Sequence, residues 1–270
     1  MKNSIHPIIA LSSKYPQLCL PLGEDVKDSE LYKRAVLRGE DCGMTPDFSL
    51  NEEDFLETID TPAGPAEILF LKDRADFEHA VRALGHRCAP VDVPKSMGAS
   101  AIRGLINWDK LHAHAEDFDS FIADKNNYLD SLILLSWGEY SAVPAERTGM
   151  SEEDWLEKSL TVRKFHELTH FISGRLFPEN REAIRDEVMA DMIGIVSALG
   201  IYEPKLAKCF LGTEGETYRP GGRLENYTDA PVQMGRVNAL IDLLGAELQK
   251  LPKMHAFALL EQLESNRIGI

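Results

Sequence analysis

The chain is poor in cysteine. It has 4 cysteines in 270 residues, at positions 19, 42, 88 and 209, with no CxxC pair and no dense framework among them. A chain of this length buries enough apolar surface to fold without disulfides. Reduced thiols in a cytoplasmic protein are therefore the expectation.

Clusters of lysine and arginine are also missing. Acidic residues outnumber basic ones 44 to 29, and the formal net charge is -15 at pH 7. Proteins that bind nucleic acids or anionic membrane surfaces present a basic stripe or patch to the phosphates. The composition therefore predicts no nucleic-acid partner and no membrane partner.

Long apolar runs are absent as well. The stretch from Ile8 to Leu11 is too short for the apolar core of a secretory signal. No segment approaches the roughly 20 apolar residues that cross a membrane as a helix. With 44% hydrophobic and 27% charged residues, the rest of the composition is typical of a globular chain.

The N-terminal half is expected to be irregular at first and then α/β. Residues 1–60 lack sustained periodicity, apart from one short helix expected near 30–38. Residues 61–145 are expected to form a small α/β region. It opens with a buried strand at 66–71 and ends with a strand at 131–143.

The C-terminal half, residues 146–270, is expected to be helical. Ser151, followed by acidic residues, predicts the start of a helix that runs to about Phe177, where Pro178 prevents continuation. A second helix is expected to end near Gly200, and two more follow, at about 232–250 and 252–264. The overall prediction is an α+β fold, in which 146–270 is a separate domain or is continuous with 61–145.

The first long helix contains the segment His166-Glu167-Leu168-Thr169-His170, an HExxH motif. Residues four apart lie on one face of a helix, so both imidazoles can reach one Zn²⁺. Glu167 then lies beside them, where a general base would act on a water. The spacing predicts a zinc site with one ion.

A third ligand is expected from the second helix. If the two helices run antiparallel around Phe177-Pro178, Glu187 reaches nearly the same height as His170. Neighbouring helix residues point about 100° apart, so only one of Asp186 and Glu187 can face the metal. Asp191, one turn after Glu187, is the candidate carboxylate for the second ring nitrogen of His166.

The segments HELTHFI (166–172) and DEVMADMIG (186–194) resemble the zinc site of the gluzincin metallopeptidases, thermolysin-like ones especially. The resemblance covers about residues 131–194. It implies a zincin-like pair of antiparallel helices in which His166, His170 and Glu187 are ligands, Glu167 is the general base and Asp191 orients a histidine. It also implies an edge strand before the motif helix, along which a peptide adds, and 131–143 has the right position for it.

The chain departs from that family in several respects. The interval between the second histidine and the glutamate is shorter than in thermolysin, and Asp186 stands where the family has Asn. The family's downstream Tyr and His, which steady the developing oxyanion, have no unique counterpart. The available candidates are Tyr218, Tyr227 and His255, along with Arg219 and Arg223, and His255 is also open to a structural interpretation.

Three hypotheses about function follow. The leading one is a zinc metallopeptidase that hydrolyses amide bonds with Glu167 as general base. The second is a zinc-dependent amidase on a small substrate, which a closed pocket would favour over an open cleft. The third is an inactive zincin-like binding protein, in which the site holds no metal or has a fourth protein ligand. Substrate identity and oligomeric state are left open.

Overall fold

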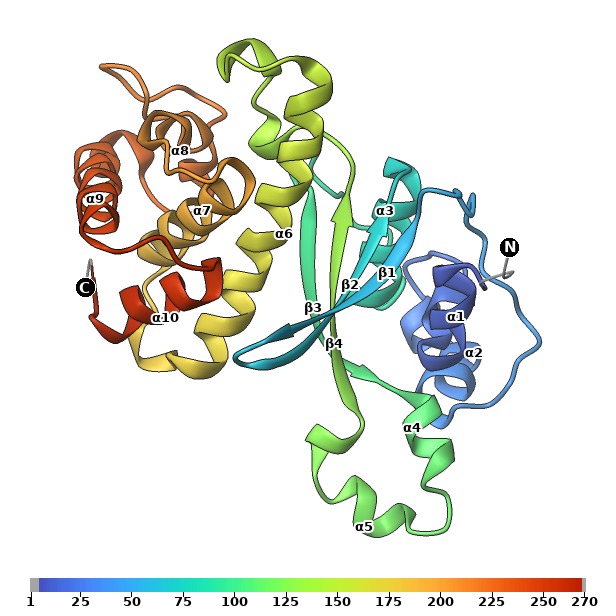
Figure 1. Ribbon diagram of the computed structural model, residues 1–270. Coiled ribbons are helices and arrows are strands. Elements are labelled where there is room, and N and C mark those ends of the chain that lie inside the picture. Colours follow the sequence, from blue (N-terminus) through green and yellow to red (C-terminus); the bar gives the residue numbers. More distant parts are fainter. Residues whose placement is uncertain (1–4, 269–270) are drawn as a thin grey trace. The chain divides into compact units, whose positions relative to one another are not determined.

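The computed structural model describes residues 5–268 and has an α+β fold (Figure 1). The chain divides into two compact units, here called the N-terminal and the C-terminal unit. The N-terminal unit contains residues up to 59, 66–94 and 99–137, and the C-terminal unit contains 60–65, 95–98 and the chain from 138 onward. The main chain thus passes into the C-terminal unit before the domain boundary that we predict at residue 145.

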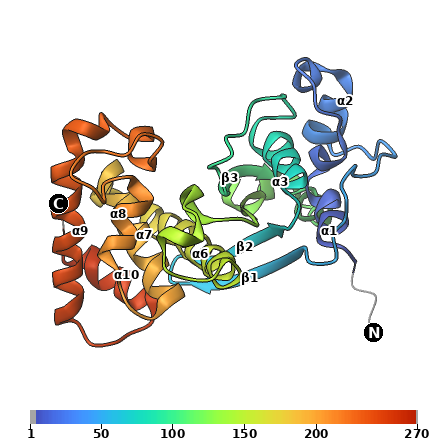
Figure 2. The same cartoon turned by 90° about the horizontal axis from the view of Figure 1, so that it is seen from above.

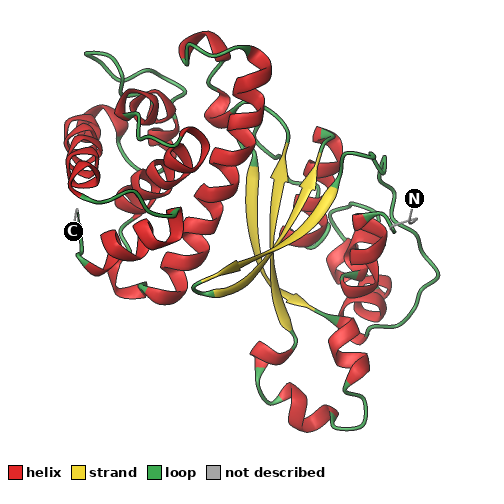
Figure 3. Ribbon diagram, in the orientation of Figure 1, coloured by secondary structure: helices red, strands yellow, loops and turns green. Residues whose placement is uncertain are grey.

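The N-terminal unit is built on a four-stranded mixed sheet (Figure 3). Its strand order is β1-β2-β4-β3, and β4 runs parallel to β2 and antiparallel to β3. In the register, Ile68 lies opposite Ile133, and Ile102 opposite Leu132. The strands are β1 (Phe55–Thr61), β2 (Gly64–Leu71), β3 (Ala99–Ile106) and β4 (Leu129–Ser136).

The predicted edge strand at 131–143 is wrong in both position and length. Strand β4 pairs on both sides, and the edges of the sheet are β1 and β3. Leu132, Leu134 and Leu135 are fully buried, as expected for a strand covered on both faces. The strand ends at Ser136, and Gly138 then adopts φ 140°, which turns the chain away before residues 139–143.

The first 60 residues are more ordered than the sequence predicts. Helix α1 (Pro7–Lys14) lies within them and strand β1 begins there. The predicted helix near 30–38 is present as α2 (Glu30–Tyr32), which continues through a π-turn to Leu37. Strand β1 escapes prediction because it is a half-exposed edge strand with acidic residues. The remaining helices of this unit are α3 (Arg74–Ala80), α4 (Trp108–Ala113) and α5 (Phe118–Ile122).

The C-terminal unit is helical. Its longest helix, α6 (Glu152–Leu176), begins at Ser151, whose hydroxyl accepts the amide of Asp154, and ends before Pro178. Helix α7 (Ala183–Leu199) ends at Gly200, whose φ of 73° is readily adopted by glycine. The other helices are α8 (Pro204–Leu211), α9 (Ala230–Lys250) and α10 (Ala256–Ser265).

Helix α7 lies between α6 and α9 (Figure 2) and contacts α8 and α10 as well. Helices α6 and α7 are antiparallel, because residue 162 faces residue 194 while residues 166 and 170 face residue 187. They pack closely: a Cβ on Gly194 would lie 2.7 Å from the carbonyl oxygen of Val162. The turn between them is held from α10 by the buried Glu264, whose carboxylate binds Ser173 at 2.7 Å and Arg185 at 2.8 Å.

Within residues 5–268, no helix combines the length and the apolar character that crossing a bilayer requires.

Candidate metal centre

Helix α6 brings two histidines together. His166 and His170 lie one turn apart, and their Nε2 atoms are 3.1 Å from each other. His166 is 6% exposed, and the side chain of His170 is 18% exposed. The i, i+4 spacing therefore produces the convergence that the motif predicts.

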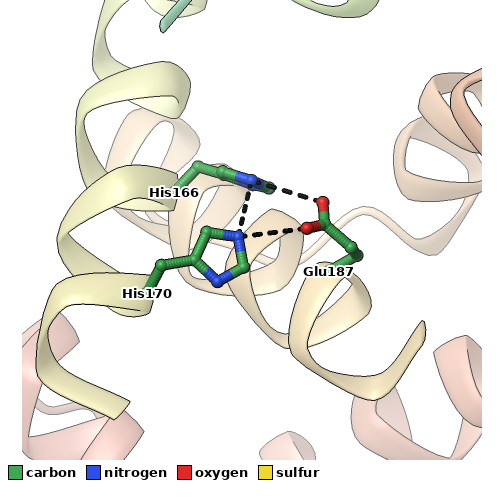
Figure 4. Close-up of side chains that lie close together, drawn as sticks. All are labelled: His166, His170 and Glu187. Carbon is green, nitrogen blue, oxygen red and sulfur yellow. Dashed lines mark hydrogen bonds and ion pairs between the residues drawn. The ribbon is translucent and has the colours of Figure 1, made fainter. Parts of the chain in front are cut away.

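Helix α7 adds the carboxylate of Glu187. Its Oε1 lies 3.3 Å from Nε2 of His170, and its Oε2 lies 3.5 Å from Nε2 of His166 (Figure 4). Among the described residues, these three side chains are the only group of His, Cys, Asp and Glu whose ligand atoms converge in a way that suits a metal ion. The two rings and the carboxylate point toward a common centre (Figure 4).

The geometry of this group fits a tetrahedral metal. Zinc binds imidazole nitrogen and carboxylate oxygen at about 2.0–2.2 Å, so two of its tetrahedral ligands lie about 3.3–3.6 Å apart. The three separations here are 3.1, 3.3 and 3.5 Å. Moreover, Oε2 of Glu187 is buried and forms no hydrogen bond among the described residues; its charged neighbours there are His166 at 3.5 Å and Arg223 at 3.8 Å. A buried anionic oxygen held only by such long contacts is suited to a cation.

A second layer of polar groups surrounds the outer nitrogen of His166. Nδ1 lies 3.1 Å from Oδ1 of Asp191 and 2.8 Å from the hydroxyl of Tyr140. The Tyr140 hydroxyl also donates to Asp191 at 2.7 Å, and the guanidinium of Arg223 binds both Asp191 and Tyr140. The predicted contact between Asp191 and His166 is thus present, within a larger cluster.

The charges in this cluster compensate one another. Burial alone would raise the pKa of the carboxyls, but Arg223 and His166 hold the pKa of Asp191 below its usual value, and the two imidazoles do the same for Glu187. In the metal-free protein, burial lowers the pKa of His166, but its contacts with the carboxylates of Asp191 and Glu187 outweigh burial and raise this pKa to about 9, so a metal ion that binds there would displace the proton of Nε2. Burial, with the charge of Asp191, raises the pKa of Tyr140 well above its usual value. Tyr140 therefore remains a hydrogen-bond donor, and both carboxylates remain ionised.

Glu167 lies on α6 between the two histidines and is half-buried. It is three residues before His170, a spacing that makes two side chains neighbours on a helix. Its carboxylate forms no hydrogen bond or ion pair with any residue between 5 and 268. It is therefore free to engage a water or a substrate.

Asp186 points away from His166, His170 and Glu187, as predicted from the rotation of about 100° between neighbouring helix residues. Its Oδ2 lies 2.5 Å from Nε of Arg181, and its Oδ1 lies 3.9 Å from Nη1 of Arg185. The choice of Glu187 over Asp186 thus follows from helix geometry.

Of the three candidates for oxyanion contacts, only Tyr227 lies at the cluster. Burial raises the pKa of its hydroxyl, and the charge of Glu187 adds to this effect, whereas Arg223 opposes it. The hydroxyl of Tyr218 instead donates to the carbonyl of Gly222 at 2.5 Å. His255 caps the start of α10 by accepting the amide of Phe257, in keeping with its structural interpretation.

Of the two arginine candidates, only Arg223 contacts the residues around His166. Arg219 lies 2.8 Å from Glu214 and binds the carbonyl of Cys209, whereas Arg223 lies in the cluster. The sequence does not predict a role for Tyr140, because the pattern of 131–143 predicts one continuous strand. The signal available for it was Gly138, a residue that often interrupts a strand.

The sequence profile described as "Family of unknown function (DUF7005)" matches residues 2–267. No curated protein and no solved structure matches the chain.

Proposed function

This chain belongs to the DUF7005 family, and for it we propose a zinc-dependent metallohydrolase that cleaves amide bonds, with the peptide bond as the leading substrate class. The observation that carries the proposal is the convergence of His166, His170 and Glu187 at separations of 3.1, 3.3 and 3.5 Å. Three protein ligands are the number that catalytic zinc sites use, because the fourth position is left for water or substrate.

The residue types and the helix pair support a catalytic site over a structural one. Structural zinc sites have four protein ligands, commonly including thiolates, and among residues 5–268 no fourth ligand joins this group. Glu167 has no use in a structural site. The antiparallel helices α6 and α7 also agree with the zincin-like arrangement that the resemblance to gluzincins implies.

Each residue has a proposed part in the reaction. Zinc, when bound, polarises the amide carbonyl and makes a water more acidic. Glu167 takes the proton of the attacking water and delivers it to the leaving amine, which departs poorly as an anion. Asp191 holds His166 in a fixed orientation, and Tyr227, which keeps its proton, donates a hydrogen bond to the oxyanion that develops.

We do not propose that a substrate adds to β4, the strand found in place of the one predicted at 131–143. Strand β4 pairs on both sides, so its backbone groups are already used within the sheet. The preference for peptides over small amides therefore rests on the resemblance of helices α6 and α7 to the zinc-binding helices of the gluzincin metallopeptidases.

The test is a Glu167→Gln substitution. Glutamine keeps the shape of the side chain but cannot accept the proton, so zinc remains bound while hydrolysis falls by about 10²–10⁴-fold. His170→Ala, in contrast, loses both zinc and hydrolysis. Zinc content and turnover of a fluorogenic peptide library measure the two properties separately.

Glu157→Gln is the matched control, since Glu157 is an exposed glutamate of the same helix. It leaves both zinc binding and turnover unchanged. Undiminished hydrolysis by Glu167→Gln contradicts its assignment as the base. A wild-type protein that binds zinc and hydrolyses no amide supports the binding-protein hypothesis instead.

A further inference from the structure

We propose that Tyr140 and Arg223 are positioning residues for His166: together with Asp191 they keep its Nδ1 protonated, so that Nε2 offers its lone pair to the metal. The inference rests on the proposed function of the cluster as a zinc site. It adds two residues that neither the motif nor the helix pair supplies, because Tyr140 lies before α6 and Arg223 lies between α8 and α9.

The hydroxyl of Tyr140 is at the centre of the network. It lies 2.7 Å from Oδ1 of Asp191, 2.8 Å from Nδ1 of His166 and 2.6 Å from Nη1 of Arg223. Tyr140 is 4% exposed and Asp191 is fully buried, so water does not compete for these contacts. Each contact must therefore contain a proton of its own.

Counting the protons leaves one arrangement. Arg223 only donates and ionised Asp191 only accepts, so the single hydroxyl proton of Tyr140 must lie toward Asp191 or toward His166. If it lay toward His166, the oxygens of Tyr140 and Asp191 would face each other at 2.7 Å without a proton between them. The Tyr140 proton therefore lies toward Asp191, and the proton near His166 is on its own Nδ1.

This arrangement decides what the inner nitrogen can do. When a metal ion displaces the proton of Nε2, the imidazole keeps one proton. Because the network holds that proton on Nδ1, Nε2 presents its lone pair to the metal. This nitrogen lies 3.1 Å from Nε2 of His170 and 3.5 Å from Oε2 of Glu187. The outer network thus prepares His166 to be a metal ligand.

Hydrogen bonds also fix the backbone around Tyr140, and with it the position of the Tyr140 hydroxyl beside His166. Its amide donates to the buried hydroxyl of Ser159 at 2.9 Å. The next two residues, Ser141 and Ala142, have φ of 54° and 52°, in the left-handed region that residues with a Cβ rarely adopt. Arg223 donates to the Ser141 hydroxyl at 2.8 Å, so it binds this strained turn as well as the phenol.

The test compares the zinc affinity of Tyr140→Phe and Arg223→Lys with that of the wild type, by competition with a chromophoric chelator. Phenylalanine keeps the ring packing against Phe210 and removes only the hydroxyl. We expect each substitution to weaken zinc binding about 10–100-fold, as the loss of groups that orient metal ligands typically does. The visible absorption bands of the Co²⁺-substituted protein, which report ligand geometry, shift in both variants.

Tyr202→Phe is the matched control. The Tyr202 hydroxyl is also buried in the C-terminal unit, but it has no hydrogen-bond partner among residues 5–268. Its removal leaves zinc affinity and the Co²⁺ bands unchanged.

A purely structural contribution of Tyr140 and Arg223 gives a different result. Zinc affinity and Co²⁺ bands then equal those of the wild type, and any loss is confined to the thermal stability of the zinc-free protein. That result overturns this proposal and leaves the zinc site intact. A wild-type protein that binds neither ion overturns both proposals.

Discussion

At Asp191, one buried carboxylate neutralises a buried cation and orients a histidine at the same time. It is fully buried and accepts from Tyr140, His166 and Arg223. Within the described part of the chain, the charge of Arg223 is offset by Asp191 and, at 3.8 Å, by Glu187. Removing one partner of a buried ion pair leaves the other charge uncompensated in a medium of low polarity, which costs more than the pair contributes.

Asp191→Asn is therefore expected to affect both stability and metal binding. The amide leaves Arg223 without its main counter-ion, and we expect the free energy of unfolding of the zinc-free protein to fall by about 3–5 kcal/mol. Zinc affinity falls about 10–100-fold, because the amide no longer fixes the tautomer of His166. Denaturant unfolding and chelator competition measure the two effects.

Asp186→Asn provides the comparison on the same helix. Asp186 is also buried, but it pairs with Arg181, away from the three convergent side chains. Its substitution is expected to leave zinc affinity unchanged. Equal zinc affinities for both variants and the wild type would show that Asp191 does not orient a ligand.

The sequence predicts the site residues that lie on regular helices better than those that lie in irregular segments. His166 and His170 share a helix, so their spacing alone places them on one face, and Glu187 follows from the rise per residue of two antiparallel helices. Tyr140 and Arg223 lie in irregular segments, whose paths depend on contacts distant in sequence. No local pattern determines such a path, and for this reason Tyr140 was missed and Arg223 was one of several candidates.

Among the elements, the contact between α6 and α7 determines the distance between the histidines and Glu187. Gly194 lies two turns beyond Glu187, where the helices come close enough for an added Cβ to lie 2.7 Å from the carbonyl oxygen of Val162. Backbone atoms cannot move aside as a flexible side chain can. A larger residue must therefore push the helices apart, and the three ligand atoms separate with them.

Gly194→Ala is expected to weaken zinc binding from a distance. Overpacking at this contact costs about 1–3 kcal/mol of stability, although alanine by itself favours a helix. Zinc affinity falls with it, and the Co²⁺ bands shift. The control is Gly235→Ala on α9, where an added Cβ meets no atom within 4 Å, so the stability of that variant equals or exceeds that of the wild type. Unchanged zinc affinity in Gly194→Ala would contradict the link between helix packing and ligand geometry.

Helices were easier to predict than strands because their signals are local. Ser151, Pro178 and Gly200 mark the ends of α6 and α7 by capping and backbone restrictions. By contrast, the structure contains α8 and β3, which were not predicted, and β4 is central instead of at an edge. The place of a strand in a sheet depends on partners far away in the chain, which periodicity does not encode.

At the scale of the whole molecule, the metal-suited group stands out in a chain rich in acidic residues. The chain has 44 acidic residues and a net charge of -15, yet only one group of carboxylate and imidazole side chains in residues 5–268 converges on a metal-sized centre. Both helices that bear it belong to the C-terminal unit. The proposed chemistry is therefore complete within that unit as far as the metal ligands are concerned.

We propose that this chain holds one catalytic zinc ion through His166, His170 and Glu187. The most direct test is the metal content of the purified protein, together with its X-ray absorption spectrum. We expect one zinc per chain, with only nitrogen and oxygen neighbours at about 2.0–2.2 Å, two of them from imidazoles. A protein that retains no zinc, or one whose zinc has sulfur neighbours at about 2.3 Å, would contradict it.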